Sequence, residues 1–267
     1  MSLHPDLQLL ARTTDRLRAA GCVFAEEEAE LLLAKAADPS DLEAMLTRRI
    51  AGEPLEVVIG RMTFCGQTVL VDAGVFVPRR RTEWLVRQAV AVCPPGSVVV
   101  DLCCGTGAIG LVVAHEVPDV RLYAADIDPA AARCAARNIE HIGGQVFCGD
   151  MFEPLPAELK GGVDVVVVNA PYVPTGELGH MPSEARDHEP RHTHDGGLEG
   201  VDHHRRIGAE AGAWLRPGGH VLIETGAAQA TLTAEALSDH GLLASVVSSE
   251  ELSATVVVGH HRGNIGR

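Results

Sequence analysis

The sequence has few lysines, few aromatic residues and no long hydrophobic run. Two of its 267 residues are lysines and 3% are aromatic, and 22 basic residues against 36 acidic ones leave a net charge of −14. Proteins that bind duplex nucleic acid use Lys and Arg to neutralise phosphates, so this balance disfavours nucleic acid as the main partner. No apolar stretch approaches the roughly 18 residues of a membrane helix, and the N-terminus MSLHPDLQLL lacks the sections of a signal peptide. We therefore expect a soluble, cytoplasmic protein with no membrane partner.

The cysteines and histidines give no sign of a disulfide framework or a metal centre. The seven cysteines are scattered, odd in number and never spaced Cys-x-x-Cys, so we interpret them as small buried side chains in a reducing compartment. Five histidines occur between residues 188 and 204, but Pro190 interrupts any helix that would align them and no cysteine lies among them. We predict no metal site.

The first 78 residues differ in pattern from the rest of the chain. Residues 1–56 are predicted to be helical, and Ser40-Asp41-Leu42-Glu43 has the Ser-x-x-Glu form of a capping box that opens a helix ending near Ala51. These residues are too few to bury a large core, and we interpret them as a small module for packing or partner recognition. Residues 57–78 alternate in hydrophobicity and predict a β-hairpin linker with its turn near Cys65-Gly66-Gln67.

Residues 79–267 alternate between short apolar runs and amphipathic segments. Such alternation predicts an α/β fold in which a mostly parallel sheet is covered by helices on both faces. Helices are expected at residues 108–115 and 129–141 and before Trp214. Strands are expected at residues 98–102, 121–125, 145–148, 163–168 and 220–224, with weaker ones near 243–247 and 255–258.

A glycine-rich loop follows the first of these strands. Gly105-x-Gly107-x-x-Gly110 matches the dinucleotide fingerprint, and Asp126 closes the next strand at the place of a ribose-binding carboxylate. A nicotinamide dinucleotide would put its pyrophosphate on the helix N-terminus. S-adenosylmethionine has no phosphate, but it needs close backbone approach at the loop and an acceptor for its ribose. The loop therefore predicts an adenosine-containing cofactor without deciding between the two.

The tetrad Asn169-Ala170-Pro171-Tyr172 follows the most apolar strand. In an open α/β sheet the carboxyl ends of the strands border the ligand crevice, so the tetrad would face whatever the glycine loop holds. Asn169 Oδ1 and the Ala170 carbonyl can each accept one N–H, and Tyr172 offers a flat face. Pro171 restricts Ala170 to extended conformations. The arrangement suits a planar nitrogen nucleophile with an NH2 group, held in line with an electrophilic methyl group.

Together these motifs resemble those of a known enzyme family. The protein-glutamine methyltransferases methylate the side-chain amide of the glutamine in the Gly-Gly-Gln motif of peptide-chain release factors. The similar motifs are the glycine loop with Asp126, the tetrad, Phe76-Val77-Pro78-Arg79 with Thr82-Glu83, and Gly196-Gly197-Leu198-Glu199-Gly200. The resemblance covers nearly the whole chain. It implies a class I, Rossmann-like, seven-stranded methyltransferase domain at residues 79–267, and a helical module at 1–56 that helps dock the release factor.

The resemblance also implies roles for individual residues. The cofactor would be S-adenosylmethionine, and its methionine part would be wrapped by Cys103, Cys104, Gly105, Thr106 and Gly107. Asp126 would hold the ribose, Met151 would lie beside the adenine, and Asn169 would contact the cofactor as well as the substrate. The glutamine amide would be gripped by Asn169, Ala170, Pro171 and Tyr172, with Arg79, Glu83 and Glu189 also at the substrate.

The sequence departs from the family pattern at three places. Ala170 replaces the usual proline of an Asn-Pro-Pro-Tyr tetrad, and Cys103-Cys104 stands where Gly-Thr or Gly-Ser is usual. Arg80-Arg81 replaces Pro-Glu, which exchanges an acid for a base near the substrate entrance. These departures leave the reaction type intact but allow a paralogue with a different protein substrate.

Three alternatives stay open at this point. The tetrad would also suit the amine of a nucleobase or a small molecule, although the net charge speaks against nucleic acid. The fingerprint at Gly105–Gly110 would suit NAD in an oxidoreductase, although no hydride-handling site is evident. A binding protein could retain the same fold without catalysis.

Overall fold

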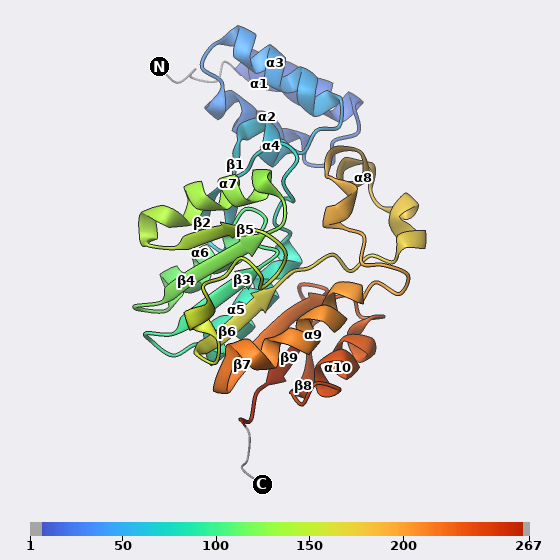
Figure 1. Cartoon of the computed structure of the whole chain (residues 1–267). Helices are drawn as coiled ribbons and strands as arrows, with labels where there is room; N and C mark the ends of the chain where they lie inside the picture. The colour runs from blue at the N-terminus through green and yellow to red at the C-terminus, as the bar shows by residue number, and fades with distance from the viewer. Residues whose placement is uncertain (1–6, 264–267) are drawn as a thin grey trace.

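A seven-stranded sheet forms the centre of the larger part of the molecule (Figure 1). In the computed structural model, which describes residues 7–263, the strand order is β5-β4-β3-β6-β7-β9-β8 and β9 runs antiparallel to both of its neighbours. The strands are β3 (Val98–Leu102), β4 (Arg121–Asp126), β5 (Gln145–Cys148), β6 (Val163–Val168), β7 (Leu215–Thr225), β8 (Leu243–Ser249) and β9 (Ala254–His260). The predicted seven-stranded, mostly parallel, Rossmann-like fold is confirmed.

Helices cover both faces of the sheet. One face packs against α5 (Glu83–Val92), α6 (Ala108–Glu116) and α7 (Pro129–Ile139), and the other against α9 (Asp202–Trp214) and α10 (Ala230–Ser238). Successive side chains of a strand point to opposite faces, so Val165 and Val167 join the first core while Val166 and Val168 join the second. Residues 165–168 of β6 are buried on both faces, which explains why all four are valine.

The N-terminal module is a separate group of four helices above the sheet (Figure 1). These are α1 (Leu7–Ala19), α2 (Ala25–Lys35), α3 (Pro39–Ile50) and α4 (Leu55–Ile59), and they enclose their own small apolar core. The predicted capping box at Ser40 is wrong, because Asp38 is the N-cap of α3 and accepts hydrogen bonds from the Ser40 and Asp41 amides. No helix between residues 7 and 263 combines the length and the apolar character of a membrane span.

A short hairpin connects the module to the sheet domain. Its strands β1 (Arg61–Phe64) and β2 (Gln67–Leu70) pair around the two-residue turn Cys65-Gly66, where both residues have positive φ, as tight hairpin turns require. The predicted turn is confirmed. Val57 and Ile59 do not belong to the hairpin, because they lie in α4.

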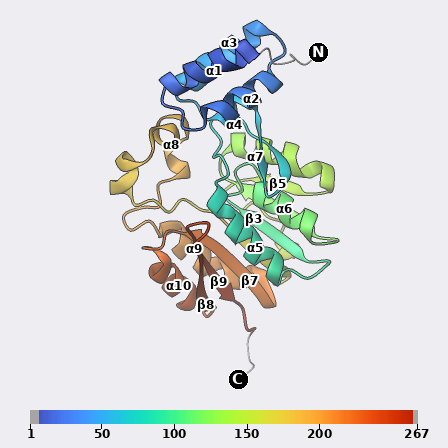
Figure 2. The ribbon, with the colours of Figure 1, turned by 180° about the vertical axis from the view of Figure 1, so that it is seen from behind.

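The connection between β6 and α9, residues 169–201, is the longest in the fold, and we call the part after the tetrad, residues 173–201, the strap. It contains the short helices η4 (Thr175–His180), α8 (Ser183–His188) and η5 (Arg191–Thr193). Figures 1 and 2 show it running between the N-terminal module and the C-terminal half of the sheet domain. Further 3-10 turns are η1 (Arg80–Thr82), η2 (Glu140–Ile142) and η3 (Ala157–Leu159).

Asn138 of α7 joins the hairpin to the glycine loop. Its Nδ2 donates to the carbonyls of Leu70 at 2.9 Å and Thr106 at 2.8 Å, and its Oδ1 accepts from the Leu70 amide at 2.8 Å. The side chain is buried. One carboxamide therefore satisfies three backbone groups, two of Leu70 and one of Thr106, a residue far from Leu70 in the sequence.

We predict that Asn138→Ala lowers the free energy of unfolding by about 2–4 kcal/mol, because it leaves buried backbone groups of Leu70 and Thr106 without partners. Urea denaturation followed by circular dichroism measures this change. Gln145→Ala, which removes an exposed carboxamide from β5, is the matched control and should change little. A loss of stability no larger than that of the control would contradict the assigned role.

Candidate active site

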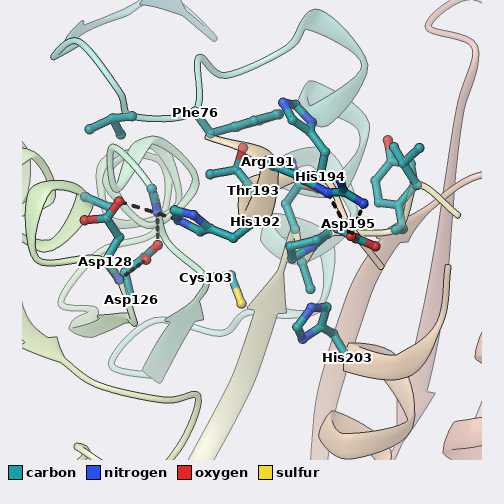
Figure 3. A pocket seen from close by; sticks show the side chains of 18 of the residues that line it. Phe76, Cys103, Asp126, Asp128, Arg191, His192, Thr193, His194, Asp195 and His203 are labelled. Atoms are coloured by element: carbon teal, nitrogen blue, oxygen red, sulfur yellow. Dashed lines mark hydrogen bonds and ion pairs between the residues drawn. The ribbon is translucent and has the colours of Figure 1, made fainter. Parts of the chain in front are cut away.

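A cavity of about 1460 Å³ opens at the carboxyl edge of the sheet. One wall consists of residues that end or follow adjacent strands, namely Cys103, Gly105, Asp126, Met151 and the tetrad 169–172. The opposite wall consists of Phe76, Arg79, Arg81 and residues of the strap. Figure 3 shows His192 of the strap pointing toward Asp126 and Asp128, while the His194 ring lies beside that of Phe76.

The glycine loop presents backbone rather than side chains to this cavity. Cys103, Gly105 and Gly107 have φ of +53°, +55° and +74°, in the left-handed region that favours glycine. At Cys103, where the related family usually has glycine, this conformation carries a cost of about 1 kcal/mol. Cys103 and Gly105 line the cavity, whereas Cys104, Thr106 and Gly107 lie beneath the loop and do not.

Gly107 caps α6 from below the loop. A Cβ there would lie 3.2 Å from Cβ of Ala135, so the close packing of the loop on α7 favours glycine. Gly110 fills a similar place on α6, where a Cβ would lie 2.8 Å from Leu122 Cδ1. Gly107 and Gly110 therefore allow the loop and α6 to pack closely on α7 and the sheet, while Gly105 exposes its backbone to the cavity.

Asp126 is fixed by backbone amides on both carboxylate oxygens. Oδ2 accepts from the Gly105 amide at 2.8 Å and Oδ1 from the Asp128 amide at 2.9 Å. Burial raises its pKa, and these two hydrogen bonds offset part of the rise. Each oxygen keeps a second lone pair, and the residue lines the cavity. The carboxylate is thus oriented to accept hydrogen bonds from a ligand.

Asp101, behind the glycine loop, is a second acid held away from water. Its Oδ2 accepts from the Gly110 amide at 2.9 Å, and Oδ1 has no hydrogen-bond partner within residues 7–263. Burial raises the pKa of Asp101 to about 8, so the carboxyl group keeps its proton over much of the neutral range. Asp101 therefore adds little negative charge beneath the loop.

The tetrad carries two unused acceptors. Neither the Asn169 side chain nor the Ala170 carbonyl makes a hydrogen bond within the part of the chain that the structure describes, and both residues line the cavity. A Cβ on Gly196 would lie 2.7 Å from Tyr172 Cα and 2.8 Å from the Pro171 carbonyl oxygen. The glycine-rich end of the strap thus packs directly on the tetrad backbone and fixes its path.

Glu189 and Arg79 form a buried ion pair. Both carboxylate oxygens of Glu189 accept from Arg79 Nη2, at 2.7 and 2.6 Å, and Oε1 also accepts from the Val77 amide at 3.1 Å. His194 Nε2 lies 2.9 Å from Oε2, without hydrogen-bond geometry. Arg79 lines the cavity and Glu189 does not. Glu189 therefore ties the strap to the segment that carries Phe76 and Arg79, rather than facing a ligand.

Of the two remaining residues that the sequence assigned to the site, one lines the cavity and the other does not. Met151 lines the cavity with a φ of +47°, beside Asp150, which pairs with Arg206 of α9 at 2.7 Å. Glu83 lies outside the cavity lining and pairs with Arg87 at 3.6 Å. Its position therefore gives no support to a contact with substrate.

Two contacts at the cavity were not expected from the sequence. His192 of the strap lies 3.5 Å from the Asp128 carboxylate, so the strap reaches the edge of the Asp126 site (Figure 3). Glu224, the buried acid near the end of β7, accepts from the Tyr172 hydroxyl at 3.2 Å. An acid that directly follows the apolar run 221–223 at this edge of a sheet is a signal that could have revealed Glu224.

Comparisons with known proteins agree with this architecture. A profile of the methyltransferase small domain family matches residues 67–181. The crystal structure of a methyltransferase from Pyrococcus furiosus covers 84% of this chain and 99% of its own with a TM-score of 0.56, at 16% identity, which supports the fold alone.

Two curated relatives cover most of both sequences. The release factor glutamine methyltransferase of Mycolicibacterium smegmatis is 36% identical over 90% of this chain and 91% of its own. The 4-amino-L-phenylalanine/4-methylamino-L-phenylalanine methyltransferase of Streptomyces pristinaespiralis is 34% identical over 83% of each. Proteins with the first of these two names from other bacteria match at 30–37% identity. The chain therefore belongs to the release factor glutamine methyltransferase family.

Proposed function

We propose that this protein transfers the methyl group of S-adenosylmethionine to the side-chain amide of a protein glutamine, in the Gly-Gly-Gln motif of a peptide-chain release factor. The observation that carries the proposal is the pair of unused acceptors, Asn169 Oδ1 and the Ala170 carbonyl, in the cavity that also contains Asp126 and the glycine loop. A carboxamide NH2 has two N–H donors that match two such acceptors.

The residues present fit the proposed cofactor. Asp126 keeps free lone pairs for ribose hydroxyls, and Cys103 and Gly105 bring backbone close to the space where a methionine part would lie. Met151 offers an apolar side chain in the same cavity for the adenine. When bound, S-adenosylmethionine would supply an electrophilic methyl carbon on a sulfonium.

The chain's own contribution to the reaction is alignment of the acceptor nitrogen. Asn169 Oδ1 and the Ala170 carbonyl would each take one N–H, so the nitrogen lone pair is directed at the methyl carbon. The nitrogen would take the methyl group with S-adenosylhomocysteine as the leaving group, and the methylated amide would then lose a proton to water, so no side chain needs to act as a base. Such positioning contributes several kcal/mol to catalysis.

A protein substrate is supported by the size and surroundings of the site. The 1460 Å³ cavity has room for more than one small molecule. Above it, the N-terminal module carries large apolar side chains that are well exposed, among them Val23, Phe24 and Leu31. We propose that residues 1–56 dock the release factor, residues 57–78 act as the linker, and residues 79–267 carry the chemistry.

A second candidate is a small amino acid with an aromatic amine. The relative from Streptomyces pristinaespiralis is named for such substrates and matches this chain about as well as the release factor enzymes do. Arg81 lines the cavity beside Tyr172, where a cation would suit a carboxylate. An aromatic amine also offers a planar NH2, so the same acceptors would hold it.

Mass mapping of the modified residue tests the proposal. The purified protein, S-adenosylmethionine with a labelled methyl group and a recombinant release factor should yield one labelled peptide, with the label on the glutamine of Gly-Gly-Gln. A release factor with that glutamine replaced by alanine is the control. Label on 4-amino-L-phenylalanine but not on the release factor would favour the second candidate.

We predict that Asn169→Ala lowers the kcat of methyl transfer by about 100-fold or more, because the nitrogen loses an aligned acceptor. Affinity for S-adenosylhomocysteine, measured by calorimetry, should change by less than about threefold. Gln145→Ala, an exposed carboxamide outside the cavity, should change neither quantity. Equal losses of turnover and of cofactor affinity in Asn169→Ala would show that the side chain serves the cofactor instead.

We also predict a pH dependence of cofactor affinity that depends on Asp126. Burial raises the pKa of this carboxyl above its ordinary value, so on acidification it gains a proton, and loses an acceptor for the ribose, at a higher pH than an exposed aspartate does. Affinity for S-adenosylhomocysteine should therefore fall on acidification, beginning above the ordinary pKa of an aspartate. In Asp126→Asn the affinity should be about 10-fold weaker at pH 7 and should no longer show this fall.

His192 is the control for this measurement, because its imidazole lies 3.5 Å from the Asp128 carboxylate, beside the Asp126 site. His192→Gln should retain the fall in affinity. If the pH dependence of affinity persists in Asp126→Asn, or disappears in His192→Gln, then Asp126 is not the residue whose protonation weakens binding.

A further inference from the structure

Glu224 is a buried acid that contacts the acceptor end of the cavity without lining it. It lies near the carboxyl end of β7, beside β6, and its residue surface is 1% exposed. Oε1 accepts from the Tyr172 hydroxyl at 3.2 Å, and Oε2 has no hydrogen-bond partner within residues 7–263. A buried carboxylate with an unpaired oxygen lowers the stability of the folded protein, which argues against a purely structural role for Glu224.

Three groups face this carboxylate. Arg81 Nε lies 3.5 Å from Oε1, and Tyr172 and Thr82 approach it from the tetrad and from η1. Burial raises the pKa of Glu224, and these three neighbours offset part of the rise. The carboxylate therefore lies between η1, which immediately precedes α5, and the last residue of the tetrad.

Glu224 also controls a second contact of the Tyr172 ring. The Arg81 guanidinium lies 5.8 Å from the ring centroid, within the range of a cation–π interaction, while its Nε is held by Glu224. The same acid thus holds the hydroxyl end of Tyr172 directly and one side of the ring through Arg81. A ring held at both places cannot rotate freely about its side-chain bonds.

We propose that Glu224 is a positioning residue for methyl transfer, which acts by fixing the Tyr172 ring at the acceptor end of the cavity. This proposal about Glu224 rests on the proposed function in one respect, namely that Tyr172 faces the methyl acceptor. The contact itself does not depend on which acceptor is used. Glu224 would therefore affect turnover without affecting binding of the cofactor.

Kinetics of four variants test the proposal. Tyr172→Phe removes the hydroxyl, Glu224→Leu removes its acceptor, and Glu224→Gln keeps an acceptor oxygen without the charge. We expect Tyr172→Phe and Glu224→Leu each to lower kcat by about 10-fold. The double variant Tyr172→Phe/Glu224→Leu should lose clearly less than the product of the two single losses, because both substitutions act on the same ring. Glu224→Gln should retain more activity than Glu224→Leu. The KM for S-adenosylmethionine should stay within about twofold in all four.

A merely structural role gives a different result. The losses of kcat in the two single variants would then multiply in the double variant. Alternatively, the loss of kcat in each variant would equal its loss of S-adenosylhomocysteine-binding sites, which are counted by titration in parallel. Either outcome overturns the proposal, as does full activity of Glu224→Leu. If Glu224→Leu fails to fold, Glu224→Gln and its double variant with Tyr172→Phe carry the same comparison.

Tyrosine NMR separates failure of this proposal from failure of the proposed function. The chain has two tyrosines, so Tyr123→Phe assigns both Cζ signals of protein labelled with 13Cζ-tyrosine. Glu224→Leu should shift the Tyr172 signal and leave that of Tyr123 unchanged, whether or not a release factor is methylated. An unshifted Tyr172 signal would overturn the contact, whereas a shifted signal with no methylated release factor would refute only the proposed substrate.

Discussion

The register of three parallel strands is the constraint on which the rest of the site depends. Leu102 of β3 is paired with Ala125 of β4 on one side and with Val168 of β6 on the other. Cys103, Asp126 and Asn169 are each the next residue along, so they leave the sheet together at one edge. Because side chains alternate between faces, a slip of one residue would bury valines in place of these groups and exchange the two cores. The apolar runs on both faces therefore fix the functional geometry as well as the fold.

The strap forms the wall of the cavity opposite the carboxyl edge of the sheet. Polar contacts to the N-terminal module, to the segment that follows the hairpin and to the sheet domain hold the strap in place. Glu184 pairs at 2.8 Å with Arg49, which Glu28 holds in the N-terminal module. Glu189 binds Arg79 near the hairpin, and His192 reaches Asp128 at the cavity. The module is thus connected to the cavity by a short chain of charged side chains. In a protein of net charge −14, two arginines, Arg79 and Arg191, line the wall opposite the tetrad.

The sequence was sufficient for the sheet and for the carboxyl-edge residues, because strands buried on both faces are apolar runs with clear ends. Residues 98–102, 145–148 and 163–168 were predicted with the bounds that the structure has. The predicted start of α3 was wrong because two nearby residues can both cap a helix, and Asp38 rather than Ser40 is the N-cap. Glu189 was expected at the substrate, but it is buried against Arg79, a partner 110 residues away that no local pattern reveals. Glu224 has a local signal, because it follows an apolar run of β7, but its contact with Tyr172 depends on strands that meet only in the folded sheet.

The most direct test of the central claim is a crystal structure of the protein with S-adenosylhomocysteine and a peptide that contains Gly-Gly-Gln. The account predicts the glutamine nitrogen at about 3 Å from both Asn169 Oδ1 and the Ala170 carbonyl oxygen, with the Asp126 carboxylate on the ribose. An Asn169 side chain turned away from the sulfur, or a peptide bound outside the cavity, would contradict it.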